Sequence, residues 1–170
     1  MIGTNTRSLD CLTPEGQKWI ARQSTIAQII AKVTGASARE TLADPSNTID
    51  VRFYVGGDLK AIAEIKCREM DVDELRRYGS YLITHDKLVR AYGVSRDLKV
   101  PMYLFVGLRR DRRIVYWKLT DCTGAPIIDI ERRITDTKRT CNDAQRIKRI
   151  NAYIPLDNMR ELKYSGDMTW

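Results

Sequence analysis

Residues 49–66, with the sequence IDVRFYVGGDLKAIAEIK, decide the fold of this chain. The residues before the glycine pair alternate strictly between apolar and polar side chains, which is the period of a strand with one buried face. Gly56-Gly57-Asp58 follows, and glycine accepts the positive φ angles that hairpin turns require. The stretch therefore predicts a β-hairpin, with residues 59–66 as its second strand.

The separation of apolar and polar faces predicts the register of this hairpin. A three-residue turn makes every cross-strand pair on one face apolar and places Asp50 directly across from Glu64 on the other face. A two-residue turn would put Asp50 opposite Ile65 and mix the faces, which a sheet with one buried side does not tolerate. We therefore expect the three-residue turn. Its apolar pairs are Val55 with Leu59, Phe53 with Ala61, Val51 with Ala63, and Ile49 with Ile65.

In this register two carboxylates become close neighbours. The β-carbons of Asp50 and Glu64 would lie about 5 Å apart, and like charges placed in this way destabilise a sheet unless a cation compensates them. Lys66 lies on the same face, but one ammonium group does not neutralise two carboxylates. A divalent metal ion would, and hard oxygen ligands suit magnesium or manganese.

Asp50, followed on the next strand by Glu64-Ile65-Lys66, resembles the active-site signature of the PD-(D/E)xK nuclease superfamily. The resemblance implies that Asp50, Glu64 and the main-chain carbonyl of Ile65 bind Mg²⁺, with Mn²⁺ as a substitute. It also implies that Lys66 orients or activates the attacking water and stabilises the phosphorane-like transition state. Ile49 stands where the superfamily often has proline. An isolated Glu-x-Lys tripeptide carries little weight, because both residues are common on exposed strand faces.

The elements around the hairpin resemble the α-β-β-β-α-β restriction-endonuclease-like core, an α/β fold with a mixed central sheet flanked by helices. Thr13-Pro14-Glu15 has the chemistry of a helix start, and Gly35 can end that helix. Further elements are expected as a short crossover at 71–77, a strand at 81–83, a helix from Thr84 to about Tyr92, a buried central strand at 100–108 and its antiparallel neighbour at 114–119. A turn is expected at 44–47, and the resemblance covers about residues 13–119.

Two helices offer accessory site residues. In many members of the superfamily the first helix supplies an additional glutamate to the metal. Here Gln23 lies on the inward face of that helix, and Glu15, its only acidic residue, lies near its start. In the later helix, Lys87 occupies the first turn, where a cation beside helix N-terminal amides can face a phosphate. A solvated lysine is the alternative for Lys87.

Residues 120–170 are expected to form a basic extension of a single domain that covers 1–170. Residues 127–149 are rich in arginine and lysine and have little periodic apolar content, which is typical of a solvated, irregular segment. The alternative is an arm that contacts DNA phosphates, above all through Arg146, Lys148 and Arg149. Its other candidate contacts are Arg132, Arg133, Lys138 and Arg139. Residues 153–156 are expected to return to the sheet edge, before a short helix from Asp157.

Composition narrows the possible classes of function. The net charge of +7 favours a polyanionic partner, above all nucleic acid. No stretch has the length of a membrane span, and the four cysteines lack zinc-site spacing, which fits a reducing cytoplasm. A single histidine argues against a Ser-His-Asp hydrolase and against nucleases that need several histidines. No phosphate-binding loop of the GxxxxGK[ST] type is present.

The sequence therefore predicts a magnesium-dependent deoxyribonuclease that hydrolyses phosphodiester bonds, with an endonuclease expected. DNA is the expected partner, no membrane is involved, and a dimer is expected if the protein self-associates. A phage-encoded protein acting in the cytoplasm of a bacterial host is the expected setting. The alternative is a nucleic-acid-binding protein on the same fold, with weak or lost cleavage. A basic structural or assembly protein would leave the combination of Asp50, Glu64 and Lys66 unexplained.

Overall fold

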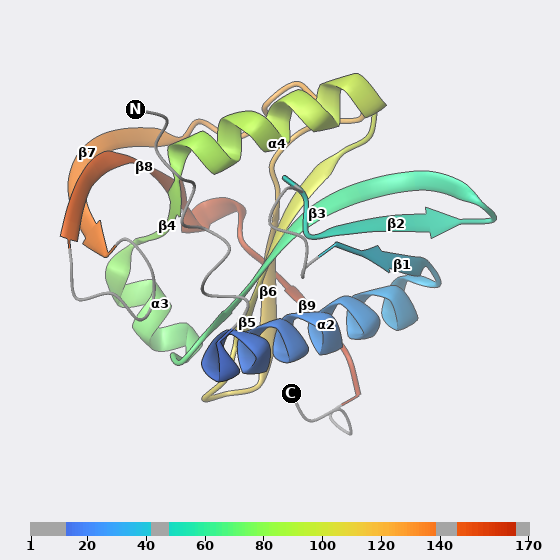
Figure 1. Cartoon of the computed structure of the whole chain (residues 1–170), viewed down its shortest axis with the longest axis horizontal. Coiled ribbons are helices and arrows are strands. Elements are labelled where there is room, and N and C mark those ends of the chain that lie inside the picture. Colours follow the sequence, from blue (N-terminus) through green and yellow to red (C-terminus); the bar gives the residue numbers. More distant parts are fainter. Residues whose placement is uncertain (1–12, 42–47, 139–145, 166–170) are drawn as a thin grey trace.

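Two β-sheets organise this computed structural model, which describes residues 13–41, 48–138 and 146–165 (Figure 1). The large sheet has six strands in the order β1 (Ser37–Glu40), β2 (Val51–Val55), β3 (Asp58–Arg68), β5 (Met102–Leu108), β6 (Arg113–Lys118) and β9 (Arg160–Leu162). The small sheet has the order β4 (Ser80–Thr84), β8 (Arg146–Pro155) and β7 (Glu131–Lys138). The helices of the described residues are α2 (Pro14–Thr34), α3 (Val72–Tyr78), α4 (His85–Leu98) and the 3-10 turn η1 (Leu156–Asn158).

Helix α2 begins and ends where its capping residues predict. The hydroxyl of Thr13 accepts a hydrogen bond from the Gly16 amide at 3.0 Å, and Pro14 occupies the first turn. Gly35 ends the helix in the left-handed conformation with φ of 67°. The predicted first helix is therefore confirmed.

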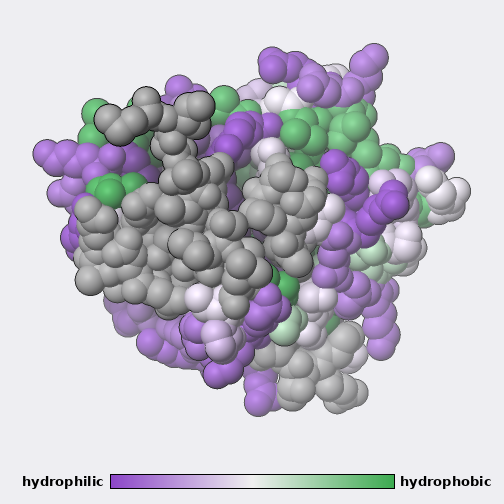
Figure 2. Space-filling view, in the orientation of Figure 1, coloured by the Kyte–Doolittle hydropathy of each residue, from purple (hydrophilic) through white to green (hydrophobic). Residues whose placement is uncertain are grey.

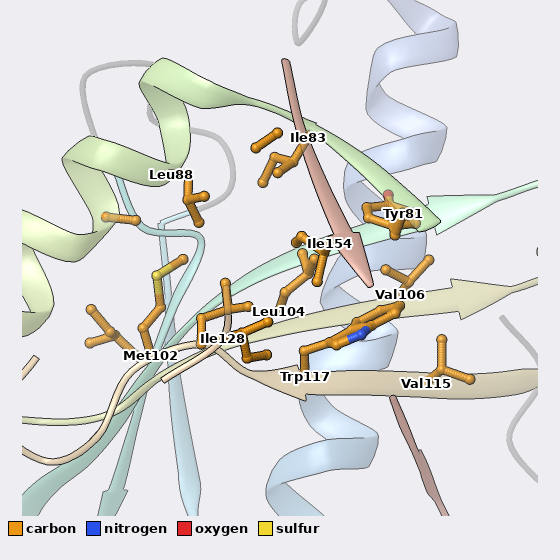
Figure 3. Close-up of a cluster of buried hydrophobic side chains, with 14 of the residues drawn as sticks. Tyr81, Ile83, Leu88, Met102, Leu104, Val106, Val115, Trp117, Ile128 and Ile154 are labelled. Atoms are coloured by element: carbon orange, nitrogen blue, oxygen red, sulfur yellow. The ribbon is translucent and has the colours of Figure 1, made fainter. Parts of the chain in front are cut away.

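Both faces of the large sheet are covered. On one face, α2 packs Ile26, Ile29 and Ile30 against side chains of β2 and β3. On the other face, α3, α4 and the small sheet cover β5 and β6, and Figure 3 shows Trp117 at the centre of that cluster. The sheet is thus a central layer between helices, as the restriction-endonuclease-like core requires.

The hairpin of β2 and β3 has the predicted register beside the site but a different turn. Val51 pairs with Ala63 and Phe53 pairs with Ala61, as the separation of faces predicts. At the tip, however, Tyr54 pairs with Leu59, so the predicted three-residue turn is wrong. Gly56 and Gly57, with φ of 61° and 90°, form a two-residue turn, and a bulge next to Phe53 absorbs the extra residue.

The third strand of the core is not the predicted one. Residues 81–83 do form a strand, β4, but it pairs with β8 in the small sheet. The large sheet instead begins with β1, which pairs antiparallel with β2. Strand β1 has the sequence Ser-Ala-Arg-Glu, which lacks the apolar alternation that would have indicated a strand.

The predicted central strand and its neighbour are confirmed. Strand β5 runs parallel to β3 and antiparallel to β6, so the sheet is mixed. The connection from β3 to β5 passes through α3, β4 and α4, and the expected crossover at 71–77 is helical. Because β3 and β5 are parallel, they require a long crossover connection of this kind.

The expectation of an irregular segment at 127–149 is wrong, because β7 and β8 form an antiparallel hairpin that joins β4. Isoleucine and threonine supply its strand propensity, although much of the hairpin surface is exposed and shows no clear apolar face. The return to the large sheet comes later than expected, at β9, and the short helix expected from Asp157 is the single turn η1. The turn expected at 44–47 lies outside the described residues.

The sequence predicts no membrane-spanning segment, and the structure tests this prediction within the described ranges. None of the helices within them is long and apolar enough to span a bilayer.

Candidate active site

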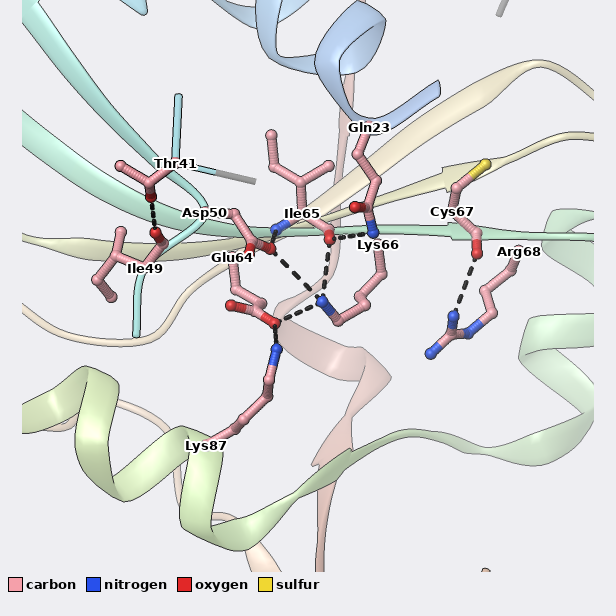
Figure 4. Close-up of polar contacts among 10 residues, drawn as sticks. All are labelled: Gln23, Thr41, Ile49, Asp50, Glu64, Ile65, Lys66, Cys67, Arg68 and Lys87. Carbon is pink, nitrogen blue, oxygen red and sulfur yellow. Dashed lines mark hydrogen bonds and ion pairs between the residues drawn. The ribbon is translucent and has the colours of Figure 1, made fainter. Parts of the chain in front are cut away.

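Three of the predicted site residues meet halfway along β3 (Figure 4). Glu64 and Lys66 project from the same side of the strand because they are two residues apart. The Lys66 Nζ atom lies 2.5 Å from Glu64 Oε1 and 3.5 Å from Asp50 Oδ2. It also donates to the carbonyl oxygen of Ile65 at 3.1 Å. One ammonium group therefore joins all the oxygens that the sequence assigned to a metal.

Asp50 reaches this cluster because the chain leaves the β-ladder just before Val51. The amide of Asp50 donates to the Ala63 carbonyl at 3.2 Å, and its own Oδ2 accepts the Ile65 amide at 2.8 Å. Asp50 thus precedes the ladder and does not form the directly opposed pair with Glu64 that the register predicted. The Thr41 amide holds the turn from β1 by donating to the Asp50 carbonyl at 2.9 Å.

Lys87 enters the cluster from the first turn of α4. Its Nζ donates to Glu64 Oε1 at 2.5 Å, so two ammonium groups share one carboxylate oxygen. Glu64 is only 2% exposed, and a charge this deeply buried requires such partners. Asp50, Glu64, Lys66 and Lys87 together form a cluster in which two negative and two positive charges balance.

The cluster changes the protonation properties of its members. Burial opposes ionisation of Glu64, but Lys66 and Lys87 outweigh that effect and lower its pKa to about 2. Burial would lower the pKa of Lys66, yet the facing carboxylates raise it. The nearby charge of Lys66, together with burial, lowers the pKa of Lys87. Burial raises the pKa of Asp50, although Lys66 opposes this shift.

The two accessory candidates in α2 have different positions. Gln23 Nε2 donates to the Ile65 carbonyl oxygen at 2.9 Å, so its side chain reaches the cluster from the opposite layer (Figure 4). Glu15 lies eight residues earlier, which is about 12 Å along a helix axis. Its carboxylate faces Lys18 at 4.0 Å. The helix therefore contributes an amide to the cluster and leaves its acidic residue outside it.

Tyr81 borders the cluster, although its sequence context marked it only as a strand residue. Its ring is buried against Trp117, and burial raises the pKa of its hydroxyl despite the nearby charges of Arg68 and Lys66. Within the described ranges this hydroxyl has no hydrogen-bond partner. No sequence signal could have indicated the position of Tyr81, because its contact with Trp117 depends on how the small sheet packs against the large one.

The donor atoms of the cluster suit a divalent cation. Asp50 and Glu64 offer carboxylate oxygens and Ile65 offers a carbonyl oxygen, the hard ligands that magnesium and manganese prefer. No group of three or more His, Cys, Asp or Glu residues arranged to hold a metal occurs in the ranges that the structure describes. A metal here would therefore depend on the carbonyl as its third protein ligand.

The predicted phosphate contacts of the C-terminal region lie on β8. Arg146 donates to the Asp136 carbonyl at 2.8 Å, and Arg149 donates to the Thr137 hydroxyl at 2.6 Å. The base of this hairpin adjoins the site, because Asn151 pairs with Thr84, three residues before Lys87. The structure thus connects the basic hairpin to the cluster through β4.

A mixed sheet between helices, with an aspartate just before β2 joined to a Glu-x-Lys segment of β3, defines a protein of the restriction-endonuclease-like class. Residues 21–156 match the model of the family described as "Phage putative PDDEXK endonuclease". The chain belongs to this family, which confirms the predicted superfamily and fold. Searches among curated proteins and among solved structures found no match.

Proposed function

We propose that this protein is a metal-dependent endonuclease that hydrolyses phosphodiester bonds in DNA. The observation that carries the proposal is the network of Asp50, Glu64 and Lys66 around the buried Glu64 carboxylate, in which one ammonium group contacts both carboxylates. Membership of a nuclease family supports the same conclusion. The position of the network beside the N-terminal turn of α4 gives a phosphate a favourable place to bind.

Each residue of the cluster has a role in this proposal. Asp50, Glu64 and the Ile65 carbonyl hold Mg²⁺ or Mn²⁺, which polarises the phosphoryl group and acidifies a water when bound. Lys66 stays protonated because the carboxylates raise its pKa, so it can orient the water and stabilise the charge that develops on the phosphoryl oxygens. Gln23 fixes the Ile65 carbonyl by donating to it.

DNA contacts follow from the positively charged residues around the site. Lys87 can exchange its contact with Glu64 for a phosphate, since its side chain is flexible and starts from the first turn of α4. Arg146 and Lys148 extend phosphate contacts along the exposed face of β8. Arg149, the third predicted phosphate contact, lies on the opposite, half-buried face. The phage reference in the family description supports a phage-encoded protein that acts inside a bacterial host. A homodimer is the oligomeric state we propose.

The test is cleavage of labelled linear, covalently closed circular and branched DNA, with Mg²⁺, with Mn²⁺ and with a chelator. Metal-dependent cleavage of the circle is the expected result. A protein that binds these DNAs but cleaves none of them would instead be a binding module on the nuclease fold. Cleavage of linear DNA alone would make it an exonuclease and would contradict the endonuclease assignment.

A further inference from the structure

The hairpin of β7 and β8 has one face that is exposed from end to end beyond its base. The pairing of the two strands places on this face Arg132, Ile134, Asp136, Arg146, Lys148 and Ile150. All of these side chains are exposed. The opposite face is largely half-buried, with Thr135, Thr137 and Ile147 among its residues. The exposed face is therefore the one available to a partner.

Two isoleucines form the centre of this face. Ile134 is 72% exposed and Ile150 is 45% exposed, and they are direct cross-strand partners. In Figure 2 the left edge, where Figure 1 places the hairpin, is mostly hydrophilic around a small hydrophobic area. Ile134 lies on β7, the edge strand of the small sheet, and Ile150 lies beside it on the central strand β8. An exposed apolar side chain on an edge strand invites unwanted strand pairing. Its presence points to a partner that covers it.

The charges on the same face indicate the chemistry of that partner. Arg132, Arg146 and Lys148 surround the isoleucines, and among the described residues of the face only Asp136 is acidic. None of these three cations forms an ion pair with a carboxylate in the described ranges. A second copy of the chain would bring a like-charged face against this one. A polyanion would be attracted to it.

Duplex DNA fits this face better than a single strand. Proteins that bind single strands stack bases on aromatic rings, and this face has no aromatic residue. A two-stranded β-ribbon fits the major groove, where apolar side chains contact thymine methyl groups and cations reach the phosphates. From Arg132 to Lys138 the strand extends for about 20 Å, which is enough to enter the groove.

The position of the hairpin connects this face to the proposed active site. Strand β8 pairs with β4, and β4 leads directly into α4, which carries Lys87. Arg132 lies at the base of the face and pairs with Ala152 of β8, the strand that packs against α4. Its charge opposes the burial that raises the pKa of Tyr92 in α4 to about 12. DNA that lies along the hairpin would therefore pass close to α4.

We propose that the β7–β8 hairpin is a duplex-binding arm, in which Ile134 and Ile150 contact the floor of a groove while Arg132, Arg146 and Lys148 contact the adjacent phosphates. This inference rests on the proposed function for the assignment of DNA as partner, and it adds the form of the DNA and the element that holds it. The two isoleucines contribute apolar burial, and the three cations contribute salt-dependent attraction.

The experiment measures affinity by fluorescence anisotropy in chelator, for a duplex and for a single strand of equal length, across a range of salt concentrations. The combined Ile134→Ser and Ile150→Ser variant should bind the duplex about tenfold more weakly with an unchanged salt slope, because apolar burial is lost. The single strand should be bound equally well. Ile127→Ser is the matched control, since Ile127 is 50% exposed and lies outside the hairpin.

A second variant tests the cations. Arg132→Gln combined with Lys148→Gln should reduce the salt slope by about 1.8, which corresponds to two phosphate contacts. Thermal unfolding checks that each variant folds. Unchanged duplex affinity in both the isoleucine variant and the cation variant would overturn the proposal that this hairpin binds duplex DNA. A wild-type dimer that becomes a monomer in the isoleucine variant would assign the face to self-association and would overturn it too. DNA cleavage is measured in a separate assay. Failure of the proposed duplex-binding arm can therefore be distinguished from failure of the proposed nuclease activity.

Discussion

Lys87 Nζ lies 2.5 Å from Glu64 Oε1, the same oxygen that Lys66 contacts at 2.5 Å. The pair joins the first turn of α4 to the middle of β3. Because Glu64 is the proposed metal ligand, the ammonium group of Lys87 competes with a divalent cation for this carboxylate. Without a metal the four charges of the cluster balance. A metal that takes Glu64 as a ligand, as we propose, would have to displace Lys87 from Oε1.

Lys87→Met should therefore bind Mg²⁺ or Mn²⁺ about tenfold more tightly in the absence of DNA, because a competing positive charge is removed. Isothermal titration calorimetry measures this directly. Lys60→Met is the matched control, because Lys60 pairs with Asp58 in the hairpin turn, outside the cluster. Equal metal affinity in Lys87→Met and in the wild type would show that Lys87 does not compete.

Glu64→Gln should lower the free energy of unfolding by about 3 kcal/mol near neutral pH in chelator, because it removes the buried carboxylate that Lys66 and Lys87 share. The folded pKa of Glu64, about 2, is below its ordinary 4.5, so this contribution is fully present above pH 4.5 and lost as the pH falls through about 2. Urea unfolding between pH 2 and pH 7 measures the difference. A difference that does not shrink in acid would contradict the ion pairing.

Asp50→Asn should have the opposite effect on metal-free stability. Burial raises the folded pKa of Asp50 above its ordinary value of 3.8, so ionisation of Asp50 reduces stability as the pH rises through that interval. The variant should unfold at higher urea concentration than the wild type at pH 7 in chelator, and the gain should vanish in acid. The same substitution should abolish the stabilisation that added Mg²⁺ gives to the wild type. A variant less stable than the wild type at pH 7 would show that Lys66 dominates at this carboxyl.

Tyr81→Phe should leave stability unchanged or raise it by up to about 1 kcal/mol, because the hydroxyl of Tyr81 is buried without a hydrogen-bond partner in the described residues. Tyr153→Phe provides the comparison, since the Tyr153 hydroxyl lies 3.2 Å from that of Thr135 and its loss should cost about 1 kcal/mol. Thermal unfolding of the two variants gives the answer. Marked destabilisation by Tyr81→Phe would mean that its hydroxyl has a partner after all.

The sequence was sufficient where the signals were local. The caps of α2 and the alternation of β2 depend on neighbouring residues. Helix α2 formed as predicted, and β2 formed from Val51 onward although the prediction began it at Ile49. The turn length was not predictable from face separation alone, because a bulge next to Phe53 restores the faces after a shorter turn. The separation of apolar and polar faces did predict the pairing of Val51 with Ala63 and of Phe53 with Ala61, which brings β2 alongside the Glu64 segment.

Other features depend on contacts between distant segments. Strand β1 has no apolar alternation, and in β7 and β8 exposed residues obscure any alternation of apolar and polar side chains. Local periodicity therefore could not identify any of these three strands. The first-turn lysine of α4 was noticed, but its contact with Glu64 is set by the packing of α4 over β3. Asp50 was placed near Glu64 correctly, although its bond to the Ile65 amide follows from a bend before β2 that periodicity does not reveal.

The most direct test of the proposed catalytic centre is the initial rate at which covalently closed circular DNA is cleaved in Mg²⁺ by the wild type, Glu64→Gln and Asp58→Asn. Asp58 lies at the start of β3 and is exposed, which makes its substitution the matched control. The account predicts a loss of at least about a hundredfold for Glu64→Gln, retained DNA binding, and a normal rate for Asp58→Asn. Cleavage by Glu64→Gln at a rate near that of the wild type would contradict it.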